Sequence, residues 1–113
     1  DNATYLENIQ QAAQYIDSKL FRPPYGRIKK SQAKLLQSEH QNSKFDIVMW
    51  DVLSADFDTK ITPQKCLINV IDYAVSGSII VFHDSVKAWE RLSYALPKTL
   101  EHFSKLGYSF KAL

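Results

Sequence analysis

Apolar residues near the start of the chain recur at spacings of three and four, the period of an amphipathic helix. The pattern predicts a helix over about residues 5–18, which Asn2 or Thr4 would cap. Its apolar stripe consists of Leu6, Ile9, Ala13, Ile16 and Leu20. A second helix is predicted over about residues 31–38, followed by a solvated loop that contains His40.

Apolar runs of strand length follow. Residues 45–52 contain consecutive apolar side chains, as in a strand covered on both faces, and residues 78–82 form a similar run. Shorter strands are predicted near residues 20–21 and 108–112. The predicted helices of this part span about residues 62–74, 86–94 and 96–105, with a break near Pro97 and with Leu96, Leu100 and Phe103 facing the core.

This alternation of helices and apolar strands predicts an α/β protein with parallel strands and outer helices. Four strands with their helices amount to about half of a barrel, which would leave two open sheet edges. At 113 residues the chain has the size of one small domain. The net charge of +2 does not indicate a nucleic-acid partner, and no apolar run has the length of a membrane span. Cys66 is the only cysteine, which excludes a disulfide framework, and its apolar surroundings predict a small core residue.

Residues 21–26 read Phe-Arg-Pro-Pro-Tyr-Gly. Two consecutive prolines fix two φ angles and remove two backbone donors, so this segment is predicted to be a stiff, extended loop. Arg22 and the backbone N–H of Tyr25 would be held in place by that stiffness, and Gly26 could turn the chain. An exposed arginine in a proline-rich surface connection is the alternative interpretation.

Polar and ionisable residues follow two of the predicted strands. Asp56 comes after the run at 45–52, and His83 comes directly after the run at 78–82. In parallel α/β proteins, residues just past the carboxyl ends of strands carry the chemistry. We therefore predict that Asp56 and His83 are hydrogen-bonded neighbours. The alternatives are a histidine that only satisfies a structural hydrogen bond and, for Asp56, an acid in a solvated loop.

Three segments together resemble, in order and spacing, the last three motifs of the polysaccharide deacetylases, the NodB-homology or carbohydrate esterase family 4 enzymes. They are Arg22-Pro23-Pro24-Tyr25-Gly26, Trp50-Asp51 through Asp56-Phe57, and Val81-Phe82-His83-Asp84. The resemblance implies a distorted (β/α) barrel, of which this chain would be the C-terminal half. It implies an enzyme that removes acetyl groups from an N-acetylated or O-acetylated carbohydrate.

The resemblance also implies a role for each matching residue. His83 would be the general acid that protonates the leaving amine, and Asp56 would hydrogen-bond it. Arg22 would pair with a catalytic aspartate, and the backbone N–H of Tyr25 would help to hold the oxyanion.

An acetyl pocket would be lined by Phe57, where the family usually has Trp, and by Val81, where it usually has Leu. Trp50 would line this pocket or pack in the core. Leu53 replaces an acid found in many members, which leaves the preferred acyl group and sugar open.

The family's first two motifs, which supply the catalytic base and the metal ligands, are not found in this sequence. No Asp-Asp pair occurs, and the three histidines, His40, His83 and His102, are nowhere four apart. The intact enzyme would hold a divalent metal, expected to be zinc, in the missing N-terminal part, and this chain alone would bind none and be inactive. The missing half or a second copy of the chain would cover it. By resemblance, the enzyme would act on extracellular, periplasmic or cell-envelope glycans. A non-catalytic half barrel with a carbohydrate-binding or assembly role is the alternative function.

Overall fold

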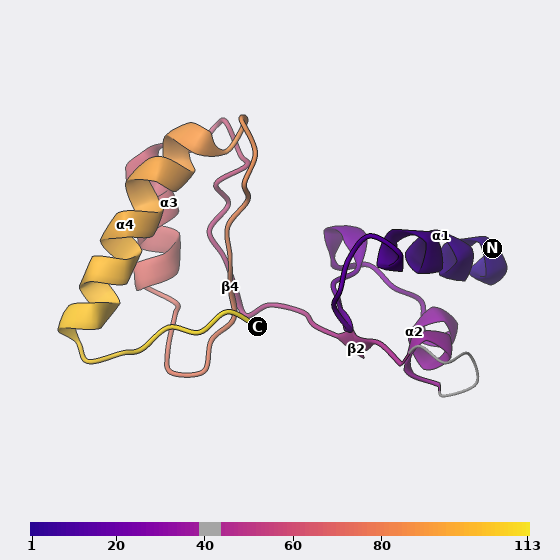
Figure 1. Ribbon diagram of the computed structural model, residues 1–113. Helices are drawn as coiled ribbons and strands as arrows, with labels where there is room; N and C mark the ends of the chain where they lie inside the picture. Colours follow the sequence, from indigo (N-terminus) through magenta and orange to yellow (C-terminus); the bar gives the residue numbers. More distant parts are fainter. Residues whose placement is uncertain (39–43) are drawn as a thin grey trace. The chain divides into compact units, whose positions relative to one another are not determined.

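A computed structural model describes residues 1–38 and 44–113 of the chain (Figure 1). His40 and the loop predicted around it lie outside the described residues. The chain forms two compact units, Asp1–Met49 and Trp50–Leu113, which are called the first and second unit below. Each unit combines helices with one pair of parallel strands, which confirms the α/β prediction and the parallel strand direction.

The first unit contains α1 (Asn2–Ala13), β1 (Leu20–Phe21), the short 3-10 helix η1 (Pro24–Gly26), α2 (Lys30–Gln37) and β2 (Asp46–Ile47). Strands β1 and β2 pair in parallel, with Leu20 opposite Asp46 and Phe21 opposite Ile47. The core of the unit is formed by Ile9, Leu36 and Phe45. Helix α2 and strand β1 lie close to their predicted positions.

Helix α1 begins and ends earlier than its apolar stripe predicts. Its cap is Asp1, whose carboxylate accepts a hydrogen bond from the Thr4 N–H at 2.9 Å. The helix ends at Ala13, and Ile16 is 58% exposed rather than buried. Beyond the helix, the Ser18 hydroxyl accepts the N–H of Leu20 and so supports a turn in place of another helical residue.

The second unit contains β3 (Val52–Leu53), α3 (Pro63–Ile71), β4 (Ile80–Val81) and α4 (Trp89–Lys105). As predicted, α3 starts at a capped proline, and the Thr62 hydroxyl accepts the Lys65 N–H at 3.1 Å. Helices α3 and α4 lie side by side and cover the β3–β4 pair (Figure 1). Cys66 and Val70 are completely buried beneath α4, which confirms Cys66 as a core residue.

The single strand predicted over residues 45–52 is wrong. It is two strands, because β2 pairs with β1 in the first unit and β3 pairs with β4 in the second. The residues between them pair with neither partner as strand, and Met49 is 42% exposed. The Asp51 carboxylate accepts the Ile79 N–H at 2.7 Å, just before β3 begins.

The break predicted at Pro97 is also wrong, because α4 runs through it as one helix. The buried residues of α4 recur every four positions and are Arg91, Ala95, Thr99 and Phe103. Pro97 lies on the exposed side, so its ring does not disturb this face. Packing along the whole helix offsets the roughly 3 kcal/mol that an interior proline costs. Leu100, predicted to face the core, is 39% exposed.

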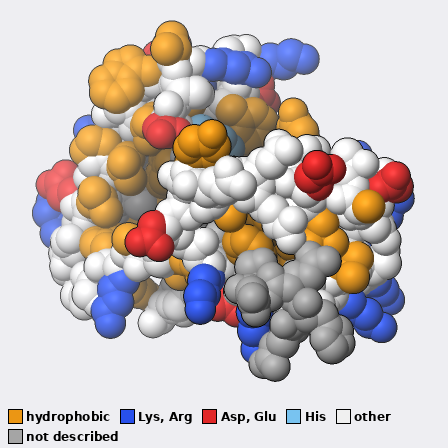
Figure 2. Space-filling view, turned by 45° about the vertical axis from the view of Figure 1, so that its right-hand side comes forward, with side chains coloured by type: hydrophobic (Ala, Val, Ile, Leu, Met, Phe, Trp, Pro, Cys, Tyr) orange, Lys and Arg blue, Asp and Glu red, His pale blue; other side chains and the backbone are white. Residues whose placement is uncertain are grey.

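The strand predicted over residues 108–112 does not form. In the described part of the chain no strand pairs with this segment, and Phe110 is 45% exposed. Tyr108 instead places its ring against Phe103, with the ring centres 5.3 Å apart. Large hydrophobic side chains remain exposed in both units, among them Tyr25, Tyr73, Val86 and Trp89, and the space-filling view shows hydrophobic patches between charged groups (Figure 2).

Candidate active site

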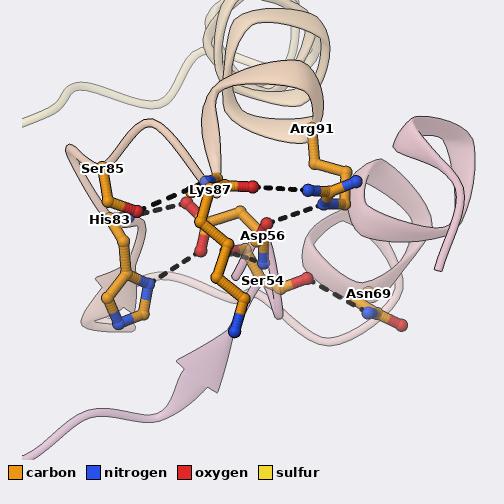
Figure 3. A network of polar contacts seen from close by, with 8 residues as sticks. Ser54, Asp56, Asn69, His83, Ser85, Lys87 and Arg91 are labelled. Atoms are coloured by element: carbon orange, nitrogen blue, oxygen red, sulfur yellow. Dashed lines mark hydrogen bonds and ion pairs between the residues drawn. The ribbon is translucent and has the colours of Figure 1, made fainter. Parts of the chain in front are cut away.

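The candidate site lies where strands β3 and β4 end. Val52 pairs with Ile80 and Leu53 with Val81, and the next backbone bond runs from the Ser54 N–H to the Val81 carbonyl. The chain leaves both strands at the same edge. Parallel pairing therefore brings Asp56 and His83, 27 positions apart, into one cluster of polar side chains (Figure 3).

Asp56 and His83 make two contacts. The Asp56 Oδ1 lies 2.7 Å from the His83 Nδ1, and the Asp56 Oδ2 accepts the His83 backbone N–H at 2.6 Å. This confirms that the two residues are hydrogen-bonded neighbours. An ionised carboxylate can only accept, so His83 carries a proton on Nδ1. Asp56 is completely buried, whereas the His83 side chain is 37% exposed, and no described residue bonds its Nε2. The arrangement orients a histidine whose second nitrogen is available to a reactant.

The main chain of Asp56 is also held by hydrogen bonds. Its N–H donates to the Ser54 hydroxyl at 3.3 Å, and its carbonyl accepts from the Arg91 Nε at 2.7 Å. The Ser54 carbonyl in turn accepts from the Asn69 side chain at 3.1 Å. The sequence reasoning missed Arg91, which is 4% exposed. The sequence spacing could have indicated that Arg91 is buried, because it precedes Ala95 by four residues on the buried face of α4.

Ala55, directly before Asp56, has a φ of 61°. A residue with a Cβ occupies this left-handed conformation at a cost of about 1–2 kcal/mol. Its carbonyl accepts the Asp58 N–H at 2.9 Å, which closes a tight turn after the strand. The turn directs the Asp56 side chain toward His83 three residues after the strand ends, and the surrounding hydrogen bonds must maintain it.

Cys66 lies near this cluster without belonging to its hydrogen-bond chain to His83. Burial raises the pKa of the Cys66 thiol, and the negative charge of Asp56 raises it further. The Ser54 hydroxyl and the Arg91 charge oppose these effects. The thiol is therefore kept neutral, which suits a structural cysteine rather than a nucleophile.

The residues predicted to line an acetyl pocket have different surroundings. Phe57 is 37% exposed and meets the His83 ring edge-on, with the ring centres 5.2 Å apart. Trp50 is half-buried, and Val81 is 4% exposed in strand β4. Only Phe57 contacts His83 directly among these three in the described contacts. The pocket role of all three stays a prediction.

Arg22 and Tyr25 belong to the first unit, and their predicted catalytic roles stay predictions. Pro23 is extended, as expected, but a 3-10 turn follows at once, and Tyr25 itself takes a left-handed conformation with φ 56°. Bonds from the Gly26 N–H to the Pro23 carbonyl and from the Arg27 N–H to the Pro24 carbonyl close the turn. No described residue accepts the Tyr25 N–H, and Arg22 is exposed.

No group of three or more His, Cys, Asp or Glu side chains in the described part of the chain is arranged to hold a metal ion. The residues described here therefore do not form a ligand set for the zinc that the resemblance implies. His102 is half-buried on α4, where its ring meets Phe103 edge-on at 5.0 Å. In residues 1–38 and 44–113, no helix is long and apolar enough to cross a membrane.

No protein-family model and no curated protein matches the sequence. Solved structures do match. The Bc1960 peptidoglycan N-acetylglucosamine deacetylase, in complex with 4-naphthalen-1-yl-N-oxidanyl-benzamide, is 27% identical with a TM-score of 0.72 over 84% of this chain and 42% of that chain. A mutant of BA3943, a CE4 family pseudoenzyme with restored enzymatic activity, is 22% identical with a TM-score of 0.68, over 88% of this chain and 33% of that chain.

A family 4 carbohydrate esterase from Streptomyces lividans in complex with acetate is 22% identical, with a TM-score of 0.57 over 82% of this chain and 45% of that chain. The chain thus spans less than half the length of each of these structures. These similarities confirm the resemblance to the carbohydrate esterase family 4 deacetylases that the three motifs predicted.

Proposed function

We propose that this chain, which resembles carbohydrate esterase family 4 deacetylases, is the C-terminal half of such a catalytic domain. The enzyme would remove acetyl groups from an N-acetylated or O-acetylated glycan. One observation carries the proposal: the buried Asp56 carboxylate holds both the ring and the backbone of His83, at the carboxyl ends of two paired parallel strands.

His83 would be the general acid. With Nδ1 held by Asp56, the ring presents Nε2 to a bound substrate, and a proton on Nε2 could pass to the departing amine. The completely buried Asp56 carboxylate would keep the ring in the orientation that this step requires. Phe57, at the edge of the same ring, would exclude water from one side and contact the acetyl group.

Two further catalytic roles depend on residues of the first unit. Arg22 would hold a catalytic carboxylate ionised, and the Tyr25 N–H, which bonds no described residue, would stabilise the oxyanion. Trp50 and Val81 would complete the pocket wall. Both units would form half of a distorted barrel, completed by the N-terminal half or by a second copy of this chain.

A divalent metal, with zinc as the expected ion, would activate the attacking water in the intact enzyme. Its ligands would come from outside this chain, because the described residues provide no ligand set. The chain alone would therefore be inactive. The Bc1960 structure is that of a peptidoglycan deacetylase, which favours an envelope or extracellular glycan as the substrate and the same location for the enzyme.

The test is acetate release by the intact protein from N-acetylated chitooligosaccharides, peptidoglycan fragments and O-acetylated xylan. The proposal expects release from at least one of these substrates, and strong loss of release in His83→Ala and Asp56→Ala. The control is Asp58→Asn, because Asp58 lies in the same loop and its side chain bonds only the Lys60 N–H among residues 1–38 and 44–113. Undiminished release by folded His83→Ala would overturn the assignment of the acid.

A non-catalytic role is the second candidate, and two observations favour it. The similar BA3943 structure is that of a pseudoenzyme mutant. In addition, this chain carries Phe57 where the family that it resembles usually has Trp, and Leu53 where many members have an acid. In that case the intact protein would bind a glycan without releasing acetate. Binding measured by calorimetry, together with absent release by a metal-loaded sample, would favour this candidate.

A further inference from the structure

Arg91 is a buried cation whose side chain makes, among the described residues, an ion pair only with an exposed acid. It is 4% exposed, and the acid nearest to its Nη1, Glu90 at 3.4 Å, is 76% exposed. Removing a guanidinium from water is costly unless its donors find good acceptors. The acceptors that Arg91 does find are therefore the reason for its position.

Two of those acceptors are backbone carbonyls in different loops. The Arg91 Nε donates to the Asp56 carbonyl at 2.7 Å, and its Nη2 donates to the Lys87 carbonyl at 2.6 Å (Figure 3). Asp56 lies in the loop after β3, whereas Lys87 lies in the turn before α4. The planar, rigid guanidinium thus connects the two loops that carry the candidate site.

The two ends of the segment from His83 to Arg91 bond to the same residue. His83 at one end is held by the Asp56 carboxylate, and Arg91 at the other end holds the Asp56 carbonyl. The main chain of Asp56 follows the left-handed Ala55, a conformation that persists only when neighbouring contacts enforce it. Arg91 provides the shortest of the contacts to the Asp56 main chain.

We propose that Arg91 is a positioning residue: it fixes the backbone of Asp56, and thereby the orientation of the His83 ring. The catalytic consequence rests on the proposed deacetylase function, whereas the effect on the His83 ring does not. A displacement of about 1 Å at a reacting group can lower a rate by about 100-fold. Loss of the Arg91 bonds should therefore lower kcat strongly while leaving KM nearly unchanged.

The experiment compares Arg91→Met and Arg91→Lys with the control Glu90→Gln in the intact protein. Glu90→Gln removes the ion pair of Arg91 but keeps both carbonyl bonds. The first measurement is the NMR resonance of the His83 Nδ1–H, which reports the contact with Asp56 and needs no substrate. We expect this resonance to weaken or move toward that of a solvent-exposed histidine in both Arg91 variants, and to stay in place in the control.

The second measurement is kcat and KM for acetate release. We expect kcat to fall by about 10- to 100-fold in both Arg91 variants, with KM within about two-fold of the wild type. A folded Arg91→Met protein with an unchanged Nδ1–H resonance would overturn the proposal. If Arg91→Met does not fold, the Arg91→Lys variant provides the test. An unchanged Nδ1–H resonance in Arg91→Lys would mean that a positive charge alone positions the ring and that the two hydrogen bonds of the guanidinium are not needed. If the wild type releases no acetate, the proposed function fails, and the resonance alone still tests Arg91.

Discussion

Replacing Asp56 by Asn should separate the stability of the site from its chemistry. The amide keeps the size of the carboxylate but has one acceptor and one donor group. The His83 backbone N–H can only donate, so the Asn oxygen must take the place of the Oδ2 that now lies 2.6 Å from it. The Asn amino group then faces the His83 Nδ1, and it can only donate to an unprotonated nitrogen. The ring proton should therefore move from Nδ1 to Nε2.

The cost in stability follows from the two contacts. Hydrogen bonds to a charged group contribute about 1.5–3 kcal/mol each, and neutral ones contribute about 0.5–1.5 kcal/mol. Asp56→Asn replaces two hydrogen bonds to a charged group by two neutral ones, which should lower the free energy of unfolding by about 2–3 kcal/mol. The lower end of this range applies because the His83 side chain is 37% exposed. Asp56→Ala loses both bonds and leaves a backbone N–H without its acceptor, so it should cost about 3–5 kcal/mol.

Urea unfolding of the intact protein measures the stability, and two-bond ¹H–¹⁵N correlation spectra identify which ring nitrogen of His83 carries the proton. We expect Asp56→Asn to stay folded with the proton on Nε2, and kcat to fall by about 100- to 10,000-fold because residue 56 no longer accepts a hydrogen bond from Nδ1 and so no longer orients the acid. Asp58→Asn is the matched control. A ring proton that stays on Nδ1 in Asp56→Asn, or a stability loss equal to that of Asp56→Ala, would refute this reasoning.

Three further outcomes can be checked. The pKa of the Cys66 thiol is raised in the folded protein, so the neutral thiol contributes its full stability below the unfolded pKa of about 8.5. This contribution is lost as the pH rises further. The free energy of unfolding should therefore fall more steeply with alkaline pH in the wild type than in Cys66→Ala. Equal slopes would contradict it. Gly107 has a φ of 86° with no atom within 4 Å of an added Cβ, so Gly107→Ala should cost about 1–2 kcal/mol in thermal unfolding, from backbone strain alone; a neutral substitution would argue against this. The isolated 113-residue chain should not sediment as a stable monomer, because half a barrel leaves apolar area uncovered. A folded monomer would disprove the half-barrel argument.

The site was predictable from the sequence because it depends on strand ends. Asp56 and His83 each follow a short apolar run, and parallel pairing of neighbouring strands brings such ends together whatever the exact strand length. The predicted contact between Asp56 and His83 is therefore confirmed, although the predicted strand before Asp56 was longer than the observed β3. Arg91 was not predictable in this way, because its partners are carbonyl groups, which every residue has.

The boundaries of the elements were harder to predict, because they depend on packing between segments far apart in the chain. Pro97 locally favours a break, but α4 packs against α3 through a buried face that extends from Arg91 to Phe103, on both sides of the proline. The apolar run after Phe45 looks continuous, yet its two ends pair with different strands. A single sequence does not show which strand pairs with which.

The central claim is that His83 acts as a proton donor rather than as a metal ligand. The most direct test is to measure kcat and the bound metal per chain in His83→Ala of the intact protein. We predict that kcat falls by about 100- to 10,000-fold while the metal content equals that of the wild type. Metal content and kcat lost to the same extent would contradict the account and make His83 a ligand.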